Sequence, residues 1–384
     1  MTEPRPAPAP RPDRVPVVVT GLSAVSAYGR GAAALSVGLR SGRPAFAPVT
    51  RFDVSTRRVG VGALLPGAPV LLDELLTVVD EAAASAGLSA AHRAATALLL
   101  AVHGEPDGSR GLPDRPGRTG AFSRTVAEKA GLSGSVRTYT SACVAASTAV
   151  ADAAAAVAAG DAERLVVAAG YLVEPDQFAL FDAGRALAAD GAVRPFSADR
   201  KGLLLGDGVA AVVMESARAA QARGATPLAR LHGWGRAGDG YHVVQPRPDG
   251  AGLARAIEAA LGRAGLAPEQ IGYVNAHGSG SAQSDAAESA ALLRALGGHA
   301  STVPISSTKS LHGQALEASP LLELAATVLS LREGFLPVNA GYLGPDPDCP
   351  LHVLTETAAA RPQYALSLNA AFGGANTALL IGLP

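Results

Sequence analysis

Short apolar runs rich in β-branched residues alternate along this chain with longer stretches dominated by Ala and Leu. The short runs are typical of strands buried on both faces, and the longer stretches are typical of helices. Their alternation predicts an α/β protein. The predicted strands cover 15–21, which ends in a glycine turn, and 165–169, 209–214, 228–232, 271–275, 303–306, 365–369 and 377–381. The predicted helices cover 71–86, 90–100, 144–160, 253–265, 285–296 and 315–331.

The rhythm of strands and helices starts again near residue 221, which predicts two halves of similar architecture, 15–220 and 221–384. No strong sequence repeat at a fixed period accompanies it. Residues 1–14 are rich in proline, lack the apolar core of a signal peptide and are expected to form a disordered tail. Residues 104–119 are rich in Gly, Pro and Arg and are expected to form a surface loop.

The composition narrows the class of protein. A chain of 384 residues, 48% of them hydrophobic, can bury a large core as one or two coupled domains. The formal net charge of −1 argues against nucleic acid or an anionic membrane as the main partner. Two cysteines imply no disulfide framework and favour the cytoplasm. We expect no membrane span, because the apolar run 144–159 is short and dominated by Ala.

Cys143 stands at the start of the predicted helix 144–160, which lacks Pro and internal Gly and stops at Gly160. The N-terminus of a helix presents unpaired N–H groups and a positive dipole, which favour a thiolate over a thiol. A thiolate is the form that acts as a nucleophile. The alternative is a buried, inert cysteine, which is the commoner fate of a free thiol.

Two loops with glycines are candidate parts of the same site. His277 lies in the loop 275–281, directly after a predicted strand, and could hold or move a proton near neutral pH. The alternative is a histidine that only hydrogen-bonds within a tight turn. The turn 372–376 could bring backbone N–H groups close to a ligand, as an oxyanion hole requires. Taken alone, it could equally be a simple hairpin.

A third loop lies between the strand ending near residue 306 and the helix 315–331, and it holds Lys309, His312 and Gln314. The chain has only three lysines, so a lysine at this position is unlikely to serve only as a surface charge. Glu323, which has leucines on both sides, is a plausible buried partner for Lys309. The alternative for Glu323 is a solvated position on the helix.

Together these motifs resemble the condensing enzymes of the thiolase superfamily, specifically the β-ketoacyl-acyl-carrier-protein synthases of type II fatty acid and polyketide pathways. The resemblance spans nearly the whole chain after the tail. It implies a thiolase-like α/β fold, in which two pseudo-symmetric halves form a layered α-β-α-β-α sandwich. The segments that carry it are 17–22, 141–143, 206–208, 239–242, 273–278, 307–310 and 372–376, with Asp285 and Glu288.

The resemblance also implies roles for single residues. Cys143 would take an acyl chain from an acyl carrier protein as a thioester, and the enolate of a decarboxylated malonyl unit would then attack it. His277 would contact the incoming thioester carbonyl, and the N–H groups of Cys143 and Phe372 would form the oxyanion hole. Ser279 and Ser281 stand where the family usually has threonines that touch the phosphopantetheine arm. Lys309, paired with Glu323, would organise the polar end of the site.

This chain departs from the family pattern around one loop. Gln314 stands where a second catalytic histidine is expected, and glutamine can donate an N–H bond but cannot exchange a proton near neutral pH. The side chain of His312, two residues earlier, could occupy the place of this missing histidine. Glu317 stands where a small residue is usual. Because these changes are clustered, they predict an altered substrate or reaction.

We therefore expect a cytoplasmic acyltransferase that performs decarboxylative Claisen condensation in a specialised polyketide or lipid pathway. One alternative is an enzyme that transfers the acyl group to an alcohol, an amine or another carrier, or closes a ring. A less favoured one is a partner subunit like a chain-length factor. The expected partners are an acyl carrier protein and either a second copy or a chain-length-factor-like subunit. Neither a metal nor a redox cofactor is expected, because the sequence has neither His-rich ligand spacing nor a dinucleotide fingerprint. The phosphopantetheine arm would arrive on the carrier protein.

Overall fold

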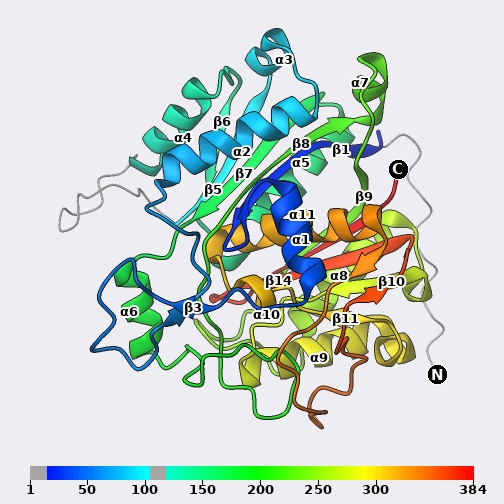
Figure 1. Cartoon of the computed structure of the whole chain (residues 1–384). Coiled ribbons are helices and arrows are strands. Elements are labelled where there is room, and N and C mark those ends of the chain that lie inside the picture. The colour runs from blue at the N-terminus through cyan, green and yellow to red at the C-terminus, as the bar shows by residue number, and fades with distance from the viewer. Residues whose placement is uncertain (1–14, 104–117) are drawn as a thin grey trace.

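The computed structural model describes residues 15–103 and 118–384, so the expected tail and most of the expected surface loop lie outside the described residues. The described chain forms one large mixed sheet with helices on its faces (Figure 1). The strands of the described chain are β1 (Val17–Ser26), β2 (Gly29–Arg30), β3 (Ala47–Pro48), β4 (Val61–Gly62), β5 (Ala97–Val102), β6 (Val136–Tyr139), β7 (Arg164–Tyr171), β8 (Gly208–Ser216), β9 (Ala229–Gly238), β10 (Ile271–Asn275), β11 (Ile305–Ser306), β12 (Phe335–Leu336), β13 (Ala358–Ala359), β14 (Tyr364–Ala370) and β15 (Ala375–Gly382). The strands β3 and β4 pair only with each other, as do β12 and β13, so these four form two small sheets apart from the large one.

Many of the buried apolar side chains belong to helices. The α-helices are α1 (Ala32–Ser41), α2 (Leu71–Ser85), α3 (Ala90–Ala94), α4 (Arg118–Lys129), α5 (Ala145–Ala159), α6 (Pro175–Ala183), α7 (Ala217–Ala222), α8 (Ala251–Ala264), α9 (Ala282–Leu296), α10 (Lys309–His312) and α11 (Ser319–Glu333). Within the described residues there are also four short 3₁₀ turns, η1 (Ala142–Val144), η2 (Pro268–Gln270), η3 (Gly297–Ser301) and η4 (Leu316–Ala318).

The sheet contains the same five-stranded pattern twice. Across the sheet, the order is β6-β5-β7-β8-β1 in the first half and β11-β10-β14-β15-β9 in the second. When the five strands of each half are numbered in chain order, both halves have the same spatial order: third, second, fourth, fifth, first. Strand directions also match. In each half the fifth strand is antiparallel to both of its neighbours, the first and the fourth, whereas the second strand is parallel to both of its neighbours, the fourth and the third. The halves join where β1 pairs with β9. This repetition agrees with two pseudo-symmetric halves, while the boundary at residues 220 and 221 stays a prediction.

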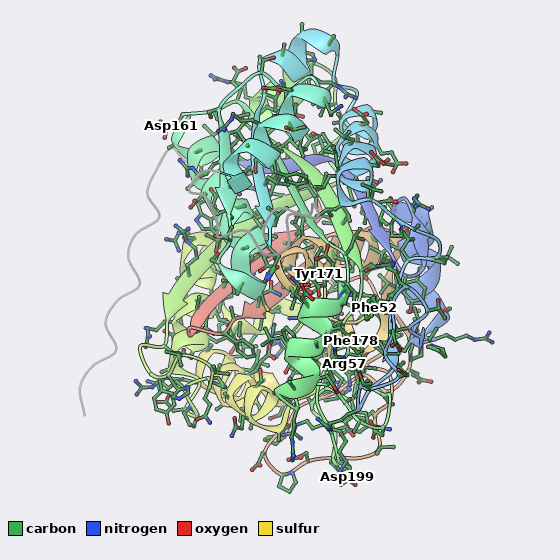
Figure 2. All side chains as sticks on the ribbon, turned by 90° about the vertical axis from the view of Figure 1, so that its left-hand side faces the viewer. Phe52, Arg57, Asp161, Tyr171, Phe178 and Asp199 are labelled. Carbon is green, nitrogen blue, oxygen red and sulfur yellow. The ribbon has the colours of Figure 1, made fainter. Side chains whose placement is uncertain are left out.

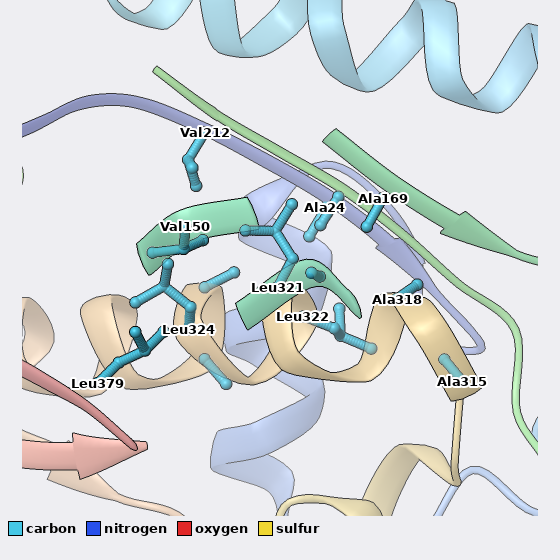
Figure 3. Close-up of a cluster of buried hydrophobic side chains, with 14 of the residues drawn as sticks. Ala24, Val150, Ala169, Val212, Ala315, Ala318, Leu321, Leu322, Leu324 and Leu379 are labelled. Atoms are coloured by element: carbon cyan, nitrogen blue, oxygen red, sulfur yellow. The ribbon is translucent and has the colours of Figure 1, made fainter. Parts of the chain in front are cut away.

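The helices form three layers around the two halves of the sheet. Helices α2 and α4 cover one outer side, α8 and α9 cover the other, and α5 and α11 lie between the halves (Figure 1). Figure 3 shows leucines of α11 packed against Val150 of α5 and against β-strand side chains such as Val212. Because α5 and α11 are apolar around most of their circumference, they suit a position inside the molecule. The predicted thiolase-like layered sandwich is confirmed.

Helix α5 and the turn before it correct one expectation. Within the described part of the chain, only Ala142–Ala159 is long and apolar enough to cross a membrane by length and composition, so our judgement that this run is too short is wrong. This stretch is 61% buried inside the structure. Its apolar character is therefore accounted for by its central position in the core.

Two predicted elements near the N-terminus are wrong. The predicted helix 90–100 ends at Ala94, and the leucines that follow form β5, where they are buried on both faces as in a parallel strand. Gly21 does not end the first strand, because β1 continues through a bulge there to Ser26. A Cβ atom at Gly21 would lie 2.0 Å from the carbonyl oxygen of Ala82 in α2, so glycine allows the helix to approach the strand.

Candidate active site

A cavity of about 460 Å³ is lined by residues that are far apart in the sequence and come from both halves of the chain. Cys143 enters it from η1, in the first half of the chain. From the second half, His277 enters from the loop after β10, Gln314 from the loop after α10, and Phe372 from the turn between β14 and β15. Cys143, His277 and Phe372 thus lie in turns that follow strands, as is usual in α/β folds, whereas Gln314 follows a short helix.

Cys143 sits in a strained turn before the long helix and not in the first turn of that helix. Its neighbour Ala142 has a φ of +50°, a left-handed conformation that costs a non-glycine residue about 1–3 kcal/mol. Burial, with a smaller contribution from the negative charge of Glu317, raises the pKa of the Cys143 thiol to about 12. Lys309 and a hydrogen bond from the Gln314 side chain act against this shift. This raised pKa runs against the expected thiolate: burial, its largest cause, favours the neutral thiol.

We expect the pH dependence of alkylation to report this raised pKa. Below its pKa, the thiolate fraction of Cys143 grows about tenfold for each pH unit, so the rate of alkylation by iodoacetamide should climb steadily from pH 7 to pH 9. The rate can be followed by intact-protein mass spectrometry on a Cys349→Ala variant, which leaves Cys143 as the only thiol. A plateau reached below pH 8 would show that the helix terminus dominates instead.

His277 is held in place through its backbone. Its own N–H and that of Gly278 each donate to the Glu288 carboxylate at 2.7 Å, and its carbonyl oxygen accepts from Lys309 Nζ at 2.8 Å. Burial, with a smaller contribution from Lys309, lowers the pKa of the imidazole well below its usual value, so His277 is neutral. No described residue hydrogen-bonds its Nδ1. A neutral imidazole in this position can donate to a substrate oxygen from one nitrogen.

Lys309 forms a buried ion pair with Glu323 of α11. The side chains of both residues are 1% exposed or less, and Asn369 Nδ2 donates to the other Glu323 oxygen at 2.5 Å. Burial raises the pKa of Glu323, while the charge of Lys309 and its hydrogen bonds act to lower it. Since Lys309 also holds the His277 carbonyl, the pair links α11 to the loop that carries the imidazole.

Gln314 presents a hydrogen-bond donor to the thiol. Its backbone bridges to the neighbouring segment, donating to Leu204 O at 2.8 Å and accepting from Gly206 N at 3.0 Å. Its side-chain oxygen accepts from Ser319 Oγ at 3.0 Å. The amide nitrogen is then directed to Cys143, whose pKa its hydrogen bond lowers. The arrangement fixes an N–H group beside the sulfur.

Comparison with known proteins places the chain in a family. The N-terminal domain of beta-ketoacyl synthase matches residues 74–220, and its C-terminal domain matches residues 228–342. Nodulation protein E of Rhizobium sp. (strain N33) is 35% identical, over 94% of this chain and 98% of that protein. The chain belongs to the β-ketoacyl synthase family.

Other relatives agree with this assignment. A putative polyketide beta-ketoacyl synthase 1 from Streptomyces cyaneus is 34% identical to the present synthase, over 96% of this chain and 98% of that one. The structure of the ishigamide ketosynthase/chain length factor matches with a TM-score of 0.87 and 29% identity, over 97% of this chain and all of that chain. Membership places this protein among the condensing enzymes of polyketide and lipid pathways.

The remaining predicted residues of this β-ketoacyl synthase fall into two groups. Ser279, Ser281 and Phe372 line the cavity, and Phe372 is 53% exposed at the tip of its turn, where its ring stacks on Phe181 with centroids 6.4 Å apart. His312 and Glu317 do not line it. His312 is fully buried, its Nδ1 lies 3.0 Å from the carbonyl oxygen of Gly313, and burial lowers its pKa to about 3. In this structure His312 therefore does not fill the place that the resemblance gives to a second histidine.

Sequence reasoning missed several residues that surround the site without lining its cavity. His103 and Tyr171 lie at the ends of β5 and β7, and Asn369 lies in β14 and holds Glu323. His103 was missed because residues 90–100 were predicted as a helix. Only a residue at the end of a recognised strand would have been expected near the active site. For Tyr171 the signal was available, since it ends a correctly predicted strand of an α/β sheet.

Proposed function

We propose that this protein is a ketosynthase-like acyltransferase that loads an acyl chain from an acyl carrier protein onto Cys143. It then forms a carbon–carbon bond by decarboxylative Claisen condensation. The observation that carries the proposal is the convergence of Cys143, His277 and Gln314 on one cavity in a β-ketoacyl synthase fold. The pathway is a specialised polyketide or lipid pathway, in line with the relatives of this chain.

Loading exchanges one thioester for another. Cys143 loses its proton, its sulfur attacks the carbonyl carbon of the carrier thioester, and the phosphopantetheine sulfur leaves and takes up a proton. The N–H groups of Cys143 and Phe372 stabilise the oxyanion that forms. Ser279 and Ser281 line the cavity and contact the arm with their hydroxyls.

Condensation follows when a malonyl carrier replaces the first. The carboxylate leaves as CO₂, and the electron pair that it leaves behind forms an enolate, which attacks the carbonyl carbon of the Cys143 thioester. The Cys143 sulfur is released and regains a proton. Gln314 and neutral His277 donate hydrogen bonds to the enolate oxygen, and neither is required to exchange a proton in this step. Lys309 and Glu323 hold the His277 loop.

We expect the Gln314→Ala variant to lose condensation but to keep loading. Removing one oxyanion donor lowers the rate by about 10²–10³, whereas acylation of Cys143 depends chiefly on the thiol and the backbone donors. CO₂ release and product mass are measured with malonyl carrier protein, with Gln221→Ala on the exposed side of α7 as the control. We expect Gln314→His to retain condensation.

The same assay separates the alternative function. An unmodified enzyme that is acylated at Cys143 but releases no CO₂ and yields no longer chain is an enzyme that transfers or cyclises the acyl group. Gln314, which cannot exchange a proton, is the residue that favours this second candidate. A chain-length-factor-like subunit is disfavoured, because Cys143, His277 and Lys309 are all present.

The partners proposed here follow from the same relatives. One solved relative, 25% identical with a TM-score of 0.87, is an acyl-carrier protein in complex with its ketosynthase, and another pairs a ketosynthase with a chain length factor. We infer that an acyl carrier protein docks at the cavity mouth of the present protein. A second copy or a chain-length-factor-like subunit completes the assembly, and the complex works in the cytoplasm.

A further inference from the structure

A second group of polar side chains lies beside Cys143 and outside the cavity described above. The turn η4, which carries Glu317, packs against η1, which carries Cys143, and against β5 and β7. His103 directly follows β5 and Tyr171 ends β7. Because β5 and β7 run parallel, their ends bring His103 and Tyr171 to the same edge of the sheet as Glu317.

These three residues, which we call the Glu317 cluster, are incompletely hydrogen-bonded. His103 Nδ1 donates to Glu317 Oε1 at 2.9 Å. Glu317 Oε2 and the Tyr171 hydroxyl are both buried, and no described residue hydrogen-bonds either of them. Both side chains belong to residues that are only 3% exposed. Leaving a buried polar atom unpaired costs about 1–3 kcal/mol, and more for a charged group, so a partner from outside the chain is expected to bind there.

The Glu317 cluster lies within electrostatic range of the reactive sulfur. After burial, the charge of Glu317 is the strongest influence that raises the pKa of Cys143. Burial also raises the pKa of Tyr171, and Glu317 and Cys143 contribute to that rise. Figure 2 shows Tyr171 near the centre of the molecule, above the helix α6 that carries Phe178. Since η4, which carries Glu317, packs against η1 and against β7, a chain bound to the Cys143 sulfur starts close to Glu317 and Tyr171.

We propose that the Glu317 cluster binds a hydroxyl group on the first carbons of the acyl chain carried by Cys143. A hydroxyl can donate to Glu317 Oε2 and accept from the Tyr171 hydroxyl at the same time. A carbonyl can only accept, and a methylene can do neither, so each would leave the carboxylate oxygen unpaired. The cluster thus selects hydroxylated acyl groups over plain ones. This inference rests on the proposed loading of Cys143.

The test compares three N-acetylcysteamine thioesters: octanoyl, 2-hydroxyoctanoyl and 3-hydroxyoctanoyl. Acylation of Cys143 is followed by intact-protein mass spectrometry on the full chain. We expect at least one hydroxylated thioester to react about tenfold faster, or more, than the octanoyl thioester, because a hydrogen bond to a buried charged group is gained. Equal rates for all three thioesters would overturn the inference, since water alone would then satisfy the cluster.

Two conservative variants show whether the cluster causes the preference. Glu317→Gln removes the charge at constant size, and Tyr171→Phe removes only the hydroxyl. Both should bring the ratio of hydroxylated to plain acylation rates close to one, whereas Tyr28→Phe, whose hydroxyl already donates to Arg43 O at 2.6 Å, should leave it unchanged. A variant that is partly unfolded loses both acylation rates in the same proportion, so the ratio of hydroxylated to plain acylation rates does not depend on the amount of folded protein. A preference that survives in both variants contradicts the inference, and a protein acylated by none of the thioesters contradicts the proposed loading itself.

Discussion

Replacing Cys143 with alanine is expected to abolish acyl loading and, with it, all condensation. No other described nucleophile of comparable reactivity lines the cavity: the only other cysteine, Cys349, lies in a separate apolar cluster. The expected result is no increase in the mass of the Cys143→Ala protein after incubation with acyl carrier protein, under conditions in which the unmodified protein gains the mass of one acyl group.

Cys349→Ala is the matched control for this experiment. Cys349 is 3% exposed, and burial raises its pKa to about 12, much as for Cys143, so the two thiols differ in position more than in acidity. Cys349→Ala should therefore load normally. An acyl adduct that persists in Cys143→Ala, or one that vanishes in Cys349→Ala alone, would assign the nucleophile to another residue and remove the basis of the proposed function.

The loops of the site could be predicted from the sequence because they follow recognisable strands. The strand Ile271–Asn275 was predicted with the observed bounds, and His277 lies in the loop directly after it. Lys309 stood out as one of three lysines, and it pairs with Glu323 in the structure. Both inferences needed only local patterning and the rule that strand ends collect functional groups.

The acidity of Cys143 could not be predicted in the same way. A helix terminus is visible in the sequence, but the depth at which the thiol is buried depends on segments far away, such as the turn η4 with Glu317. The Glu317 cluster was hidden for the same reason, since His103, Tyr171 and Glu317 meet only after the sheet has formed. Electrostatics within a core follows tertiary packing, which local periodicity does not encode.

Buried charge also gives the largest expected change in stability, at Lys309. The Lys309→Met variant leaves the Glu323 carboxylate buried with Asn369 as its remaining described partner, and breaking a buried pair in this way costs about 3–5 kcal/mol. Chemical denaturation at pH 7 should show this loss in the free energy of unfolding. Lys201→Met is the control, because Lys201 is 54% exposed and lies 4.0 Å from Asp199, so it should change stability little.

The pH dependence and a double variant separate lost charge pairing from lost packing. Burial raises the pKa of Glu323 in the folded state, and losing Lys309 raises it further, so the carboxyl group binds a proton more tightly when folded than when unfolded. The cost of Lys309→Met should therefore be larger at pH 7 and shrink as the pH falls towards 5. Adding Glu323→Gln should recover most of the loss, since no buried charge then remains. A loss that is independent of pH and persists in the double variant would mean that the lysine stem, not its charge, holds the His277 loop against α11.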